Sequence, residues 1–348
     1  MTDTASAPAD LPETMRALRL TAVESPLEMV QLPVPQPAEG EVLIQLKAAA
    51  LNHRDLWIQQ GKYPGVEPPV TLGSDGAGVV AAVGEGVPEN SLGRPVLINP
   101  SLNWGDNPWH QSPDFNILGL PDDGTFAEFV CVPAENVHRV PDKLSWQQAA
   151  ALPLAGLTAW RALFGRAALG EGERLLITGI GGGVAHYGLQ FALAKGAEVW
   201  VTSSSQAKLD AAMERGAAGG VLYTEADWAK RLAEQAGDFD VILDSAGGEG
   251  FGELVRLAGF GGRIAFFGAT RGKWPAILPQ PLFYKQVSIL GSTMGAPGEF
   301  SAMVSFTAMK DIQPVVDRVF PLREGQQALD YMAAGQQSGK IVLEMDAS

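Results

Sequence analysis

Cysteine is almost absent from this 348-residue chain, in which Cys131 is the single example. One thiol cannot form an internal disulfide, and with only four histidines the chain offers few ligands for a thiolate-rich metal site. Positive charge is also scarce, because 25 Lys and Arg stand against 39 Asp and Glu, a formal net charge of −14. A polyanion would meet net repulsion, so nucleic acid is not expected as a partner.

Long apolar runs are missing as well. No segment reaches the roughly eighteen apolar residues that a membrane span requires, so no membrane association is expected. Residues 1–14 are polar and acidic and lack the basic start and apolar stretch of a secretory signal, which predicts a disordered leader and a cytoplasmic protein. With 46% hydrophobic residues and 41 glycines, the chain has the composition of a two-domain α/β protein.

The most informative segment is 174–202, where an apolar run, a glycine cluster and a helical pattern follow one another. Residues 175–178 have the character of a buried strand, 184–195 read as a helix, and 198–201 form a second strand. This order places free backbone N–H groups and the positive end of a helix dipole where a pyrophosphate would sit, and it predicts a dinucleotide-binding turn. The predicted cofactor contacts here are Gly181, Gly182, Gly183 and Val184.

The glycine pattern departs from the simplest fingerprint. Counted from Gly179, the sixth position of G-x-G-x-x-G is Val184, whereas counting from Ile180 puts Gly182 in the middle and Ala185 last. A small residue is sufficient at the last position because it serves helix–strand packing. The alternative is an ordinary glycine-rich turn without a nucleotide.

The residues after the second strand favour NADP(H) over NAD(H). An Asp or Glu about 20 residues after the glycines usually binds the ribose hydroxyl, but residues 202–208 contain none. Ser203, Ser204 and Lys208 offer hydroxyl donors and a positive charge suited to a 2′-phosphate. The alternative is that the serines only cap the following helix.

Strand-like and helical patterns divide the chain. Residues 15–144 contain short strand-like runs between Pro and Gly turns, which predicts a barrel-like, mainly β domain. Helical patterns begin after Ser145, a candidate N-cap, and βα alternation continues to residue 295. Residues 296–348 are expected to return to the first domain, so that 145–295 form an inserted Rossmann α/β domain. Cys131, in an alternating run, is expected to be a buried thiol.

Seven motifs occur in the order and spacing of medium-chain dehydrogenases/reductases, a family that the chain resembles over nearly its whole length after Met15. They are 52–57 (NHRDLW), 73–84 (GSDGAGVVAAVG), 124–130 (GTFAEFV), 152–160 (LPLAGLTAW), 178–185 (TGIGGGVA), 244–248 (DSAGG) and 339–343 (GKIVL). The resemblance implies that the mainly β domain is a GroES-like catalytic domain. It also implies hydride transfer between NAD(P)H and a small organic substrate.

Zinc is not expected, because the residues depart from the family's metal sites. Family alcohol dehydrogenases have a cysteine at the position of Asn52 and a histidine followed by glutamate at Ser74-Asp75, and residues 99–115 lack the four cysteines of the structural zinc lobe. Amide and hydroxyl groups are poor substitutes for thiolate and imidazole at a tetrahedral zinc.

Without zinc, the resemblance shifts to quinone oxidoreductases and enoyl reductases, which implies NADPH-dependent hydride delivery to a quinone or an α,β-unsaturated carbonyl. Asn52 is the candidate to donate an amide N–H to the substrate oxygen, and Tyr63 is the candidate to donate a proton or orient the substrate. Asn52 as a turn residue and Tyr63 as a loop aromatic remain alternatives. By position in the family, further cofactor contacts are implied for Thr158, Gly268, Ala269 and Lys340.

Two other functions remain open: an alcohol or aldehyde oxidoreductase with an unusual site, and a non-catalytic NADPH-binding sensor. In each case the partner would be a small molecule. A homodimer is also expected, because family reductases pair the edge strands of two Rossmann sheets. The apolar run at 287–293 would otherwise leave such an edge exposed.

Overall fold

The computed structural model describes residues 11–345 and divides into two compact units. We call residues 11–154 with 296–345 the discontinuous unit and residues 155–295 the central unit. Most of the predicted leader lies outside the described residues. Thr14, its last predicted residue, already belongs to a strand and pairs with Pro33. Among the described residues, no helix is long and apolar enough to cross a bilayer.

The discontinuous unit is mainly β structure, in which β3 (Glu41–Ala50) pairs antiparallel with three strands. Its largest sheet has the order β10 (Val137–Arg139), β6 (Pro95–Ile98), β5 (Asp75–Val83), β3, β18 (Lys340–Glu344) and β17 (Val316–Pro321), with β9 (Phe129–Pro133) also on β3. Smaller sheets join β2 (Leu27–Pro33), β1 (Thr14–Leu20) and β4 (Val70–Thr71), and β7 (Ser101–Leu102) with β8 (Asn116–Ile117). The final strand of the chain therefore lies beside one of the first.

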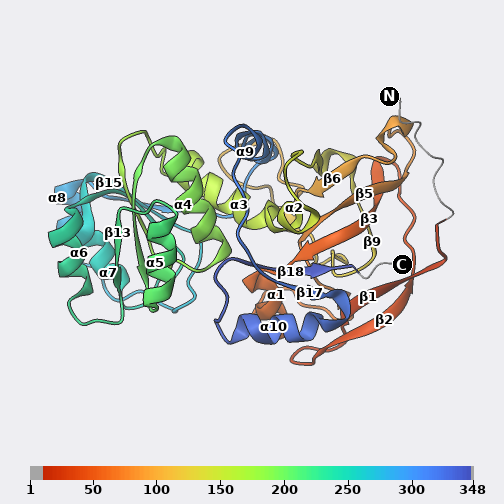
Figure 1. Ribbon diagram of the computed structural model, residues 1–348, viewed down its shortest axis with the longest axis horizontal. Helices are drawn as coiled ribbons and strands as arrows, with labels where there is room; N and C mark the ends of the chain where they lie inside the picture. The colour runs from red at the N-terminus through yellow and green to blue at the C-terminus, as the bar shows by residue number, and fades with distance from the viewer. Residues whose placement is uncertain (1–10, 346–348) are drawn as a thin grey trace. The chain divides into compact units, whose positions relative to one another are not determined.

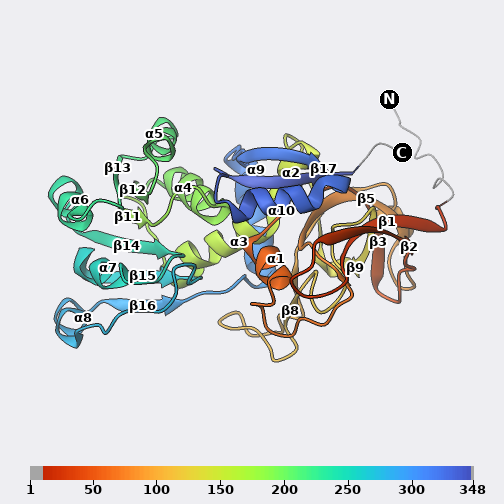
Figure 2. The same cartoon turned by 90° about the horizontal axis from the view of Figure 1, so that it is seen from below.

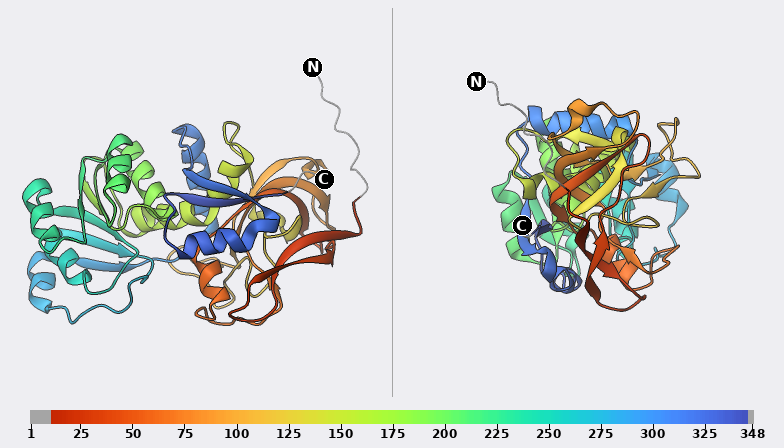
Figure 3. Two further views of the ribbon diagram at one scale, coloured as in Figure 1. Left: turned by 60° about the horizontal axis from the view of Figure 1, so that its bottom comes forward. Right: turned by 90° about the vertical axis from the view of Figure 1, so that its right-hand side faces the viewer.

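Helices cover parts of these sheets (Figure 1). They are α1 (His53–Gln59), α2 (Trp146–Ala151), α9 (Pro297–Met309) and α10 (Gly325–Ala333). Helices α1 and α10 lie side by side, as Figure 3 also shows, and Gln59 Nε2 donates to Gln326 Oε1 at 2.7 Å. Their apolar faces share one buried cluster with strands β1 and β18, which includes Leu20, Ile58 and Ile341. Burial of this cluster fixes the start of α1 against β18.

The start of α2 agrees with the sequence prediction, and the burial of Cys131 differs from it. Ser145 is the N-cap of α2, as predicted, and its Oγ accepts from Gln148 N at 3.2 Å. The helical pattern that follows is not one helix, because α2 ends at Ala151 and α3 (Pro153–Trp160) begins at a proline, before a π-helical turn over Arg161–Arg166. Cys131 is half-buried rather than buried, and burial raises the pKa of its thiol to about 12, which keeps the thiol protonated at neutral pH.

The central unit is a Rossmann sheet, as predicted. Its strands run parallel in the order β13 (Gly219–Leu222), β12 (Glu198–Ser203), β11 (Arg174–Ile177), β14 (Phe239–Asp244), β15 (Ala258–Phe266) and β16 (Ser288–Gly291), as Figure 2 shows. Helices α4 (Gly183–Lys195), α5 (Gln206–Glu214), α6 (Trp228–Ala236), α7 (Phe251–Leu257) and α8 (Pro279–Lys285) connect them. The strand order reverses between β11 and β14, the place where doubly wound sheets bind ligands.

Candidate functional site

The predicted glycine turn leads from β11 into α4, whose N-cap is Gly182. Gly179 and Gly181 have positive φ values of 66° and 143°, which only glycine adopts readily. A Cβ built at Gly179 or Gly182 would meet no heavy atom within 4 Å, so open space lies above the turn. Backbone N–H groups at the start of a 13-residue helix therefore face room for a phosphate, and the turn fits a dinucleotide.

Helix α4 packs closely on the sheet at Gly188, whereas the sequence pattern indicates Ala185 for this role. Ala185 is buried, but Gly188, one turn later, is the position without room for a side chain. A Cβ there would lie 2.8 Å from Leu243 Cδ2 and 3.3 Å from Ile177 Cδ1. Gly188 therefore lets α4 pack closely on the sheet, a role that it shares with the buried Ala185.

The serines after β12 divide into two kinds. Ser203 is 2% exposed, and its Oγ accepts from Ser205 N at 3.2 Å and donates to Ile180 O at 3.5 Å. Ser203 therefore stabilises the turn, and its predicted contact with a phosphate stays a prediction. Ser204 is exposed. Ser205 occupies the N-cap position of α5 without a side-chain capping bond, so helix capping does not account for these serines.

Lys208, in the first turn of α5, lies over the glycine turn. A Cβ at Gly181 would be 3.0 Å from Lys208 Cδ and 3.2 Å from its Nζ. The structure thus brings together the predicted glycines and the predicted cation, which are separated by more than a full helix in the sequence. A positive charge beside the N-terminus of α4 strengthens this place as an anion site.

Tyr223 and Arg271 are neighbours of this place that the sequence reasoning missed. Tyr223 follows β13 and donates its backbone N–H to Ser203 O at 3.0 Å. The Arg271 guanidinium lies 5.1 Å from the centre of the Tyr223 ring. An aromatic ring directly after the third strand of the βαβαβ pattern was the available signal, but Arg271 comes from a distant loop. A ring with a guanidinium over it can hold a flat base or a phosphate.

The ends of β11 and β14 are joined by Asp244. Its Oδ1 accepts from Thr178 Oγ1 at 2.6 Å, and its Oδ2 accepts from Gly247 N at 2.9 Å. Burial raises the pKa of the Asp244 carboxyl above its ordinary value, against these hydrogen bonds. Asp244 shapes the turn at the point where the strand order reverses.

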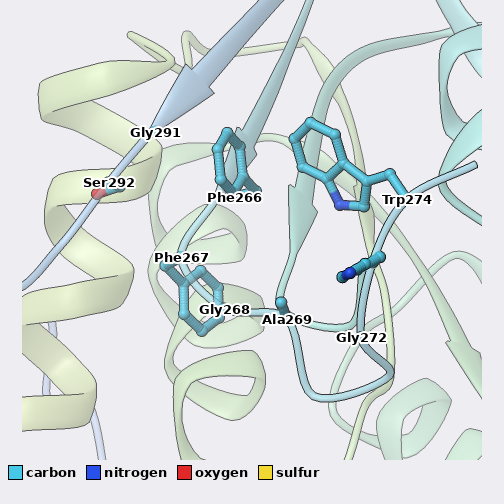
Figure 4. A pocket seen from close by; sticks show the side chains of 9 residues that line it. Phe266, Phe267, Gly268, Ala269, Gly272, Trp274, Gly291 and Ser292 are labelled. Atoms are coloured by element: carbon cyan, nitrogen blue, oxygen red, sulfur yellow. The ribbon is translucent and has the colours of Figure 1, made fainter. Parts of the chain in front are cut away.

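A cavity of about 730 Å³ opens at the carboxyl ends of β15 and β16 (Figure 4). Gly268 and Ala269 line this cavity, and their contact with a cofactor stays a prediction. Phe266 and Trp274 form its aromatic wall, with ring centres 4.9 Å apart. Its polar side chains are Lys273 and Ser292, and within the described residues the buried Ser292 Oγ has no hydrogen-bond partner. The aromatic, mainly apolar lining suits a flat ring.

Thr158 is buried in the central unit. Its Oγ1 lies 4.0 Å from Met294 Sδ, just beyond the end of β16. This contact places the α3 residue that was predicted to face the nicotinamide next to the segment that follows β16. It leaves the predicted cofactor role open.

In the discontinuous unit, Asn52 lies at the start of α1 and is 8% exposed. Its backbone N–H donates to Asp55 Oδ2 at 2.7 Å. Its side-chain Nδ2 donates to Asp75 Oδ2 at 2.9 Å, and its Oδ1 accepts from Lys340 Nζ at 2.7 Å. Asn52 is therefore the N-cap of α1, with its amide held by Asp75 and Lys340, and both of its predicted roles stay open.

Lys340 occupies the centre of this network. Its Nζ donates to Leu51 O at 2.8 Å, to Asn52 Oδ1 and to Asp75 Oδ2 at 2.8 Å, and its side chain is 4% exposed. These three acceptors match the three N–H groups of an ammonium. All three donors have acceptors inside the discontinuous unit, and the predicted contact between Lys340 and the cofactor stays a prediction.

Arg54 fixes the neighbouring loop. Its Nη1 donates to Ser74 Oγ at 2.6 Å and to Leu118 O at 3.0 Å, and its guanidinium lies 5.0 Å from the centre of the Tyr63 ring. Arg54 thus links α1 to Ser74, to the Leu118 carbonyl and to the Tyr63 ring. Tyr63 is half-buried and packs on Arg54, so both predictions for it, substrate contact and loop aromatic, remain open.

The buried carboxyl of Asp55 makes the free energy of unfolding depend on pH. Burial raises the pKa of its carboxyl to about 6, although Arg54 and the Asn52 N–H oppose this shift. Because the folded pKa exceeds the unfolded one, the stabilisation is present at low pH and is lost as pH rises through 6. The variant Asp55→Asn keeps an acceptor for Asn52 N–H. As pH rises from 5 to 8, we expect its free energy of unfolding to increase relative to that of the wild type by about 1–1.5 kcal/mol. Urea unfolding across this range checks it, and parallel pH profiles for the two proteins would contradict it.

The residues at the family's zinc positions do not fit a zinc ion. Asn52 and Ser74 are neutral, both are engaged in hydrogen bonds, and the Lys340 ammonium lies where it would repel a cation. Within residues 11–345, no group of three or more His, Cys, Asp or Glu side chains is arranged to hold a metal.

We therefore expect purified protein to contain well under one zinc per chain and to keep its thermal midpoint in chelator. Elemental analysis and a thermal scan with and without chelator measure this directly. One tightly bound zinc per chain, with a midpoint lowered by chelator, would show that the protein has a zinc site.

Comparisons with known proteins agree with this architecture. Residues 38–142 match the alcohol dehydrogenase GroES-like domain, and residues 183–309 match the zinc-binding dehydrogenase family. Zinc-type alcohol dehydrogenase-like protein YogA of Leptosphaeria maculans is 35% identical over 345 residues, which cover 92% of this chain and 95% of that protein. Acryloyl-coenzyme A reductase of Metallosphaera sedula is 30% identical over 342 residues, 94% of this chain and 99% of that protein.

A solved structure of an NAD-dependent alcohol dehydrogenase has a TM-score of 0.90 at 37% identity, covering 95% of this chain and 99% of its own. The chain therefore belongs to the medium-chain dehydrogenase/reductase superfamily and is an oxidoreductase of that type. The predicted pairing of a GroES-like domain with a Rossmann domain is confirmed.

Proposed function

We propose that this enzyme is a zinc-independent, NADPH-dependent reductase of quinones or α,β-unsaturated carbonyl compounds. The observation that carries the proposal is the Asn52 amide, which is held by Lys340 and Asp75 at the position where relatives place a metal ligand. A fixed amide N–H can stabilise negative charge on a substrate oxygen without a metal. The similarity to an acryloyl-coenzyme A reductase supports an activated alkene as the substrate class.

The preference for NADPH rests on charge. Lys208 lies over the glycine turn, Ser204 is exposed beside it, and residues 202–208 contain no carboxylate to repel a phosphate or bind a ribose hydroxyl. The glycine turn would hold the pyrophosphate, and Lys208 with Ser204 would hold the 2′-phosphate. Tyr223 with Arg271 offers a flat surface for the adenine.

A bound nicotinamide would supply a hydride to the electron-poor β-carbon of the substrate. The alkene electron pair would then form the bond between the α-carbon and the carbonyl carbon, and the carbonyl pair would move onto oxygen, which would accept from the second N–H of Asn52 Nδ2. Asp55 holds the backbone of Asn52 and Lys340 holds its side chain, so the donor needs no reorganisation during the reaction. Tyr63 lies in the same unit and orients the substrate or donates a proton, and water supplies the proton otherwise.

An alcohol or aldehyde oxidoreductase is the second candidate, and the similarity to alcohol dehydrogenases supports it. A panel of quinones and enones with NADPH, set beside a panel of primary and secondary alcohols with NADP⁺, separates the two. We expect oxidation of NADPH by members of the first panel in chelator. Turnover confined to alcohols would favour the second candidate, and binding of NADPH without turnover of either panel would favour a non-catalytic sensor.

We also propose a homodimer built on the central unit. Strand β16 is the last strand of the sheet, and α8 beside it has no buried residue. Leu278, Phe283 and Tyr284 are each more than two-thirds exposed there, and the Phe260 ring lies 5.8 Å from that of Tyr284. An unpaired strand edge next to exposed apolar side chains fits a second copy of the same surface.

We expect sedimentation at micromolar concentration to show a dimer that Phe283→Glu converts to monomer. Trp109→Glu is the matched control, because Trp109 has a similar exposure of 69% but belongs to the discontinuous unit. A wild-type monomer, or a dimer unaffected by Phe283→Glu, would contradict this assignment.

A further inference from the structure

A complete ion pair is buried in the discontinuous unit beside Asn52. Lys340 Nζ lies 2.8 Å from Asp75 Oδ2, and the two side chains are 4% and 0% exposed. Removing two charges from water is costly, and apolar residues of similar size often stabilise a fold as well or better. Stability alone therefore does not explain why this charged pair is buried.

The hydrogen bonds fix which atom of Asn52 faces which partner. An ammonium only donates, so the atom 2.7 Å from Lys340 Nζ must be the amide oxygen. An ionised carboxylate only accepts, so the atom 2.9 Å from Asp75 Oδ2 must be the amide nitrogen. Both partners thus select the same one of the two amide orientations.

Each N–H group of Lys340 and each carboxylate oxygen of Asp75 has a partner in this network. Lys340 uses its three N–H groups on Leu51 O, Asn52 Oδ1 and Asp75 Oδ2. Asp75 Oδ1 accepts from Leu154 N at 2.7 Å, so both carboxylate oxygens are occupied. The network leaves one donor, the second N–H of Asn52 Nδ2. A positive charge on the oxygen of an amide makes its N–H groups stronger donors.

We propose that Lys340 is a positioning residue for the reduction. Its ammonium supplies a fixed positive charge where a metal ion does not fit. It holds the Asn52 amide in one orientation and polarises it toward the substrate oxygen. Asp75 balances the charge and holds the other end of the amide. This inference rests on the proposed role of Asn52 in binding that oxygen, and it adds two residues that act through Asn52 without touching the substrate.

The test removes both charges and keeps the fold. Asp75→Leu/Lys340→Met replaces the pair by apolar groups, and Asp75→Asn/Lys340→Gln replaces it by a neutral polar pair, so a packing failure in one variant leaves the other. Thermal midpoints and the NADPH dissociation constant report whether each protein is folded. We expect NADPH affinity within about twofold of wild type and kcat lower by roughly a hundredfold, the loss typical of one oxyanion donor.

Asn52→Ala completes the experiment. If Lys340 acts through Asn52, adding Asn52→Ala to either double variant should lower kcat by less than about threefold more, because the same donor has already been impaired. Lys47→Met is the control, since Lys47 lies on β3 of the same unit and donates to Gln45 instead. A folded double variant with wild-type kcat, or losses that multiply independently, would overturn the inference.

The wild-type reference separates this test from that of the proposed function. If the wild type oxidises alcohols instead of reducing enones, the proposed function fails. The same variants assayed on that alcohol still decide whether Lys340 acts through Asn52, because an oxygen also carries developing charge in that reaction.

Discussion

Replacing Lys208 with alanine should weaken NADPH binding by roughly 1.5–3 kcal/mol, about ten- to a hundredfold, and leave NADH binding almost unchanged. The reason is geometric and electrostatic. Lys208 Nζ would lie 3.2 Å from a Cβ at Gly181, so its charge stands at the turn that faces the phosphates. Hydrogen bonds between charged partners are about twice as strong as neutral ones. Fluorescence titration of both nucleotides against both proteins measures the effect.

Lys195→Ala is the matched control for this experiment. Lys195 is an exposed lysine in the last turn of α4, at the opposite end of the helix from the glycine turn. The Lys195→Ala substitution removes the same charge from the same unit. It should change the affinity for NADPH and for NADH by no more than about twofold, since exposed distant charges are largely screened. Equal affinity of the wild type for NADPH and NADH, or equal losses in the Lys208 variant, would mean that the NADP assignment is wrong.

Asp75→Leu alone should lower the free energy of unfolding by about 3–5 kcal/mol, because it leaves the Lys340 ammonium buried without its counter-charge. The double change Asp75→Leu/Lys340→Met should recover most of that loss, since no unpaired charge remains. Chemical denaturation of the three proteins at neutral pH gives the comparison. The recovery matters because it separates the energetic role of the pair from its proposed role in the reaction.

An exposed ion pair provides the reference scale. Lys143 Nζ lies 2.8 Å from Asp311 Oδ2, but the side chains are 70% and 53% exposed. Lys143→Met should therefore leave the free energy of unfolding almost unchanged. If Asp75→Leu costs no more than this control, or if the double change is as unstable as the single one, the buried pair does not behave as described.

Local patterns were sufficient to predict the Rossmann unit. The apolar run ending near Ile177, the glycines and the helical pattern to Lys195 lie next to one another in the chain, and each obeys the periodicity of its element. Ser145 was recognisable as an N-cap because a capping serine acts within one turn. The helical pattern after Ser145 is divided at Pro153, which removes a backbone donor and starts a new helix.

The candidate site could be predicted only in part, because its key contacts join distant residues. Lys340 and Asp75 are 265 positions apart, and no periodicity links them. Family position predicts a contact between the lysine and the cofactor, and no pattern in the sequence indicates its contact with Asn52, which the pairing of β18 with β3 produces. The contacts of Ser203 were also not predictable from its neighbours in sequence. Its neighbours in sequence suggested an exposed donor, but its position at the end of a buried parallel strand turns the hydroxyl inward.

The most direct measurement of the central claim is the position of deuterium in the product of an α,β-unsaturated ketone reduced with NADPH that carries deuterium at C4. The protein is assayed in chelator after its metal content has been measured. A reductase that stabilises an enolate oxygen through Asn52 should place the deuterium on the β-carbon and give a saturated ketone. Deuterium on the carbonyl carbon, giving an allylic alcohol, or turnover that appears only after zinc is added, would contradict the account.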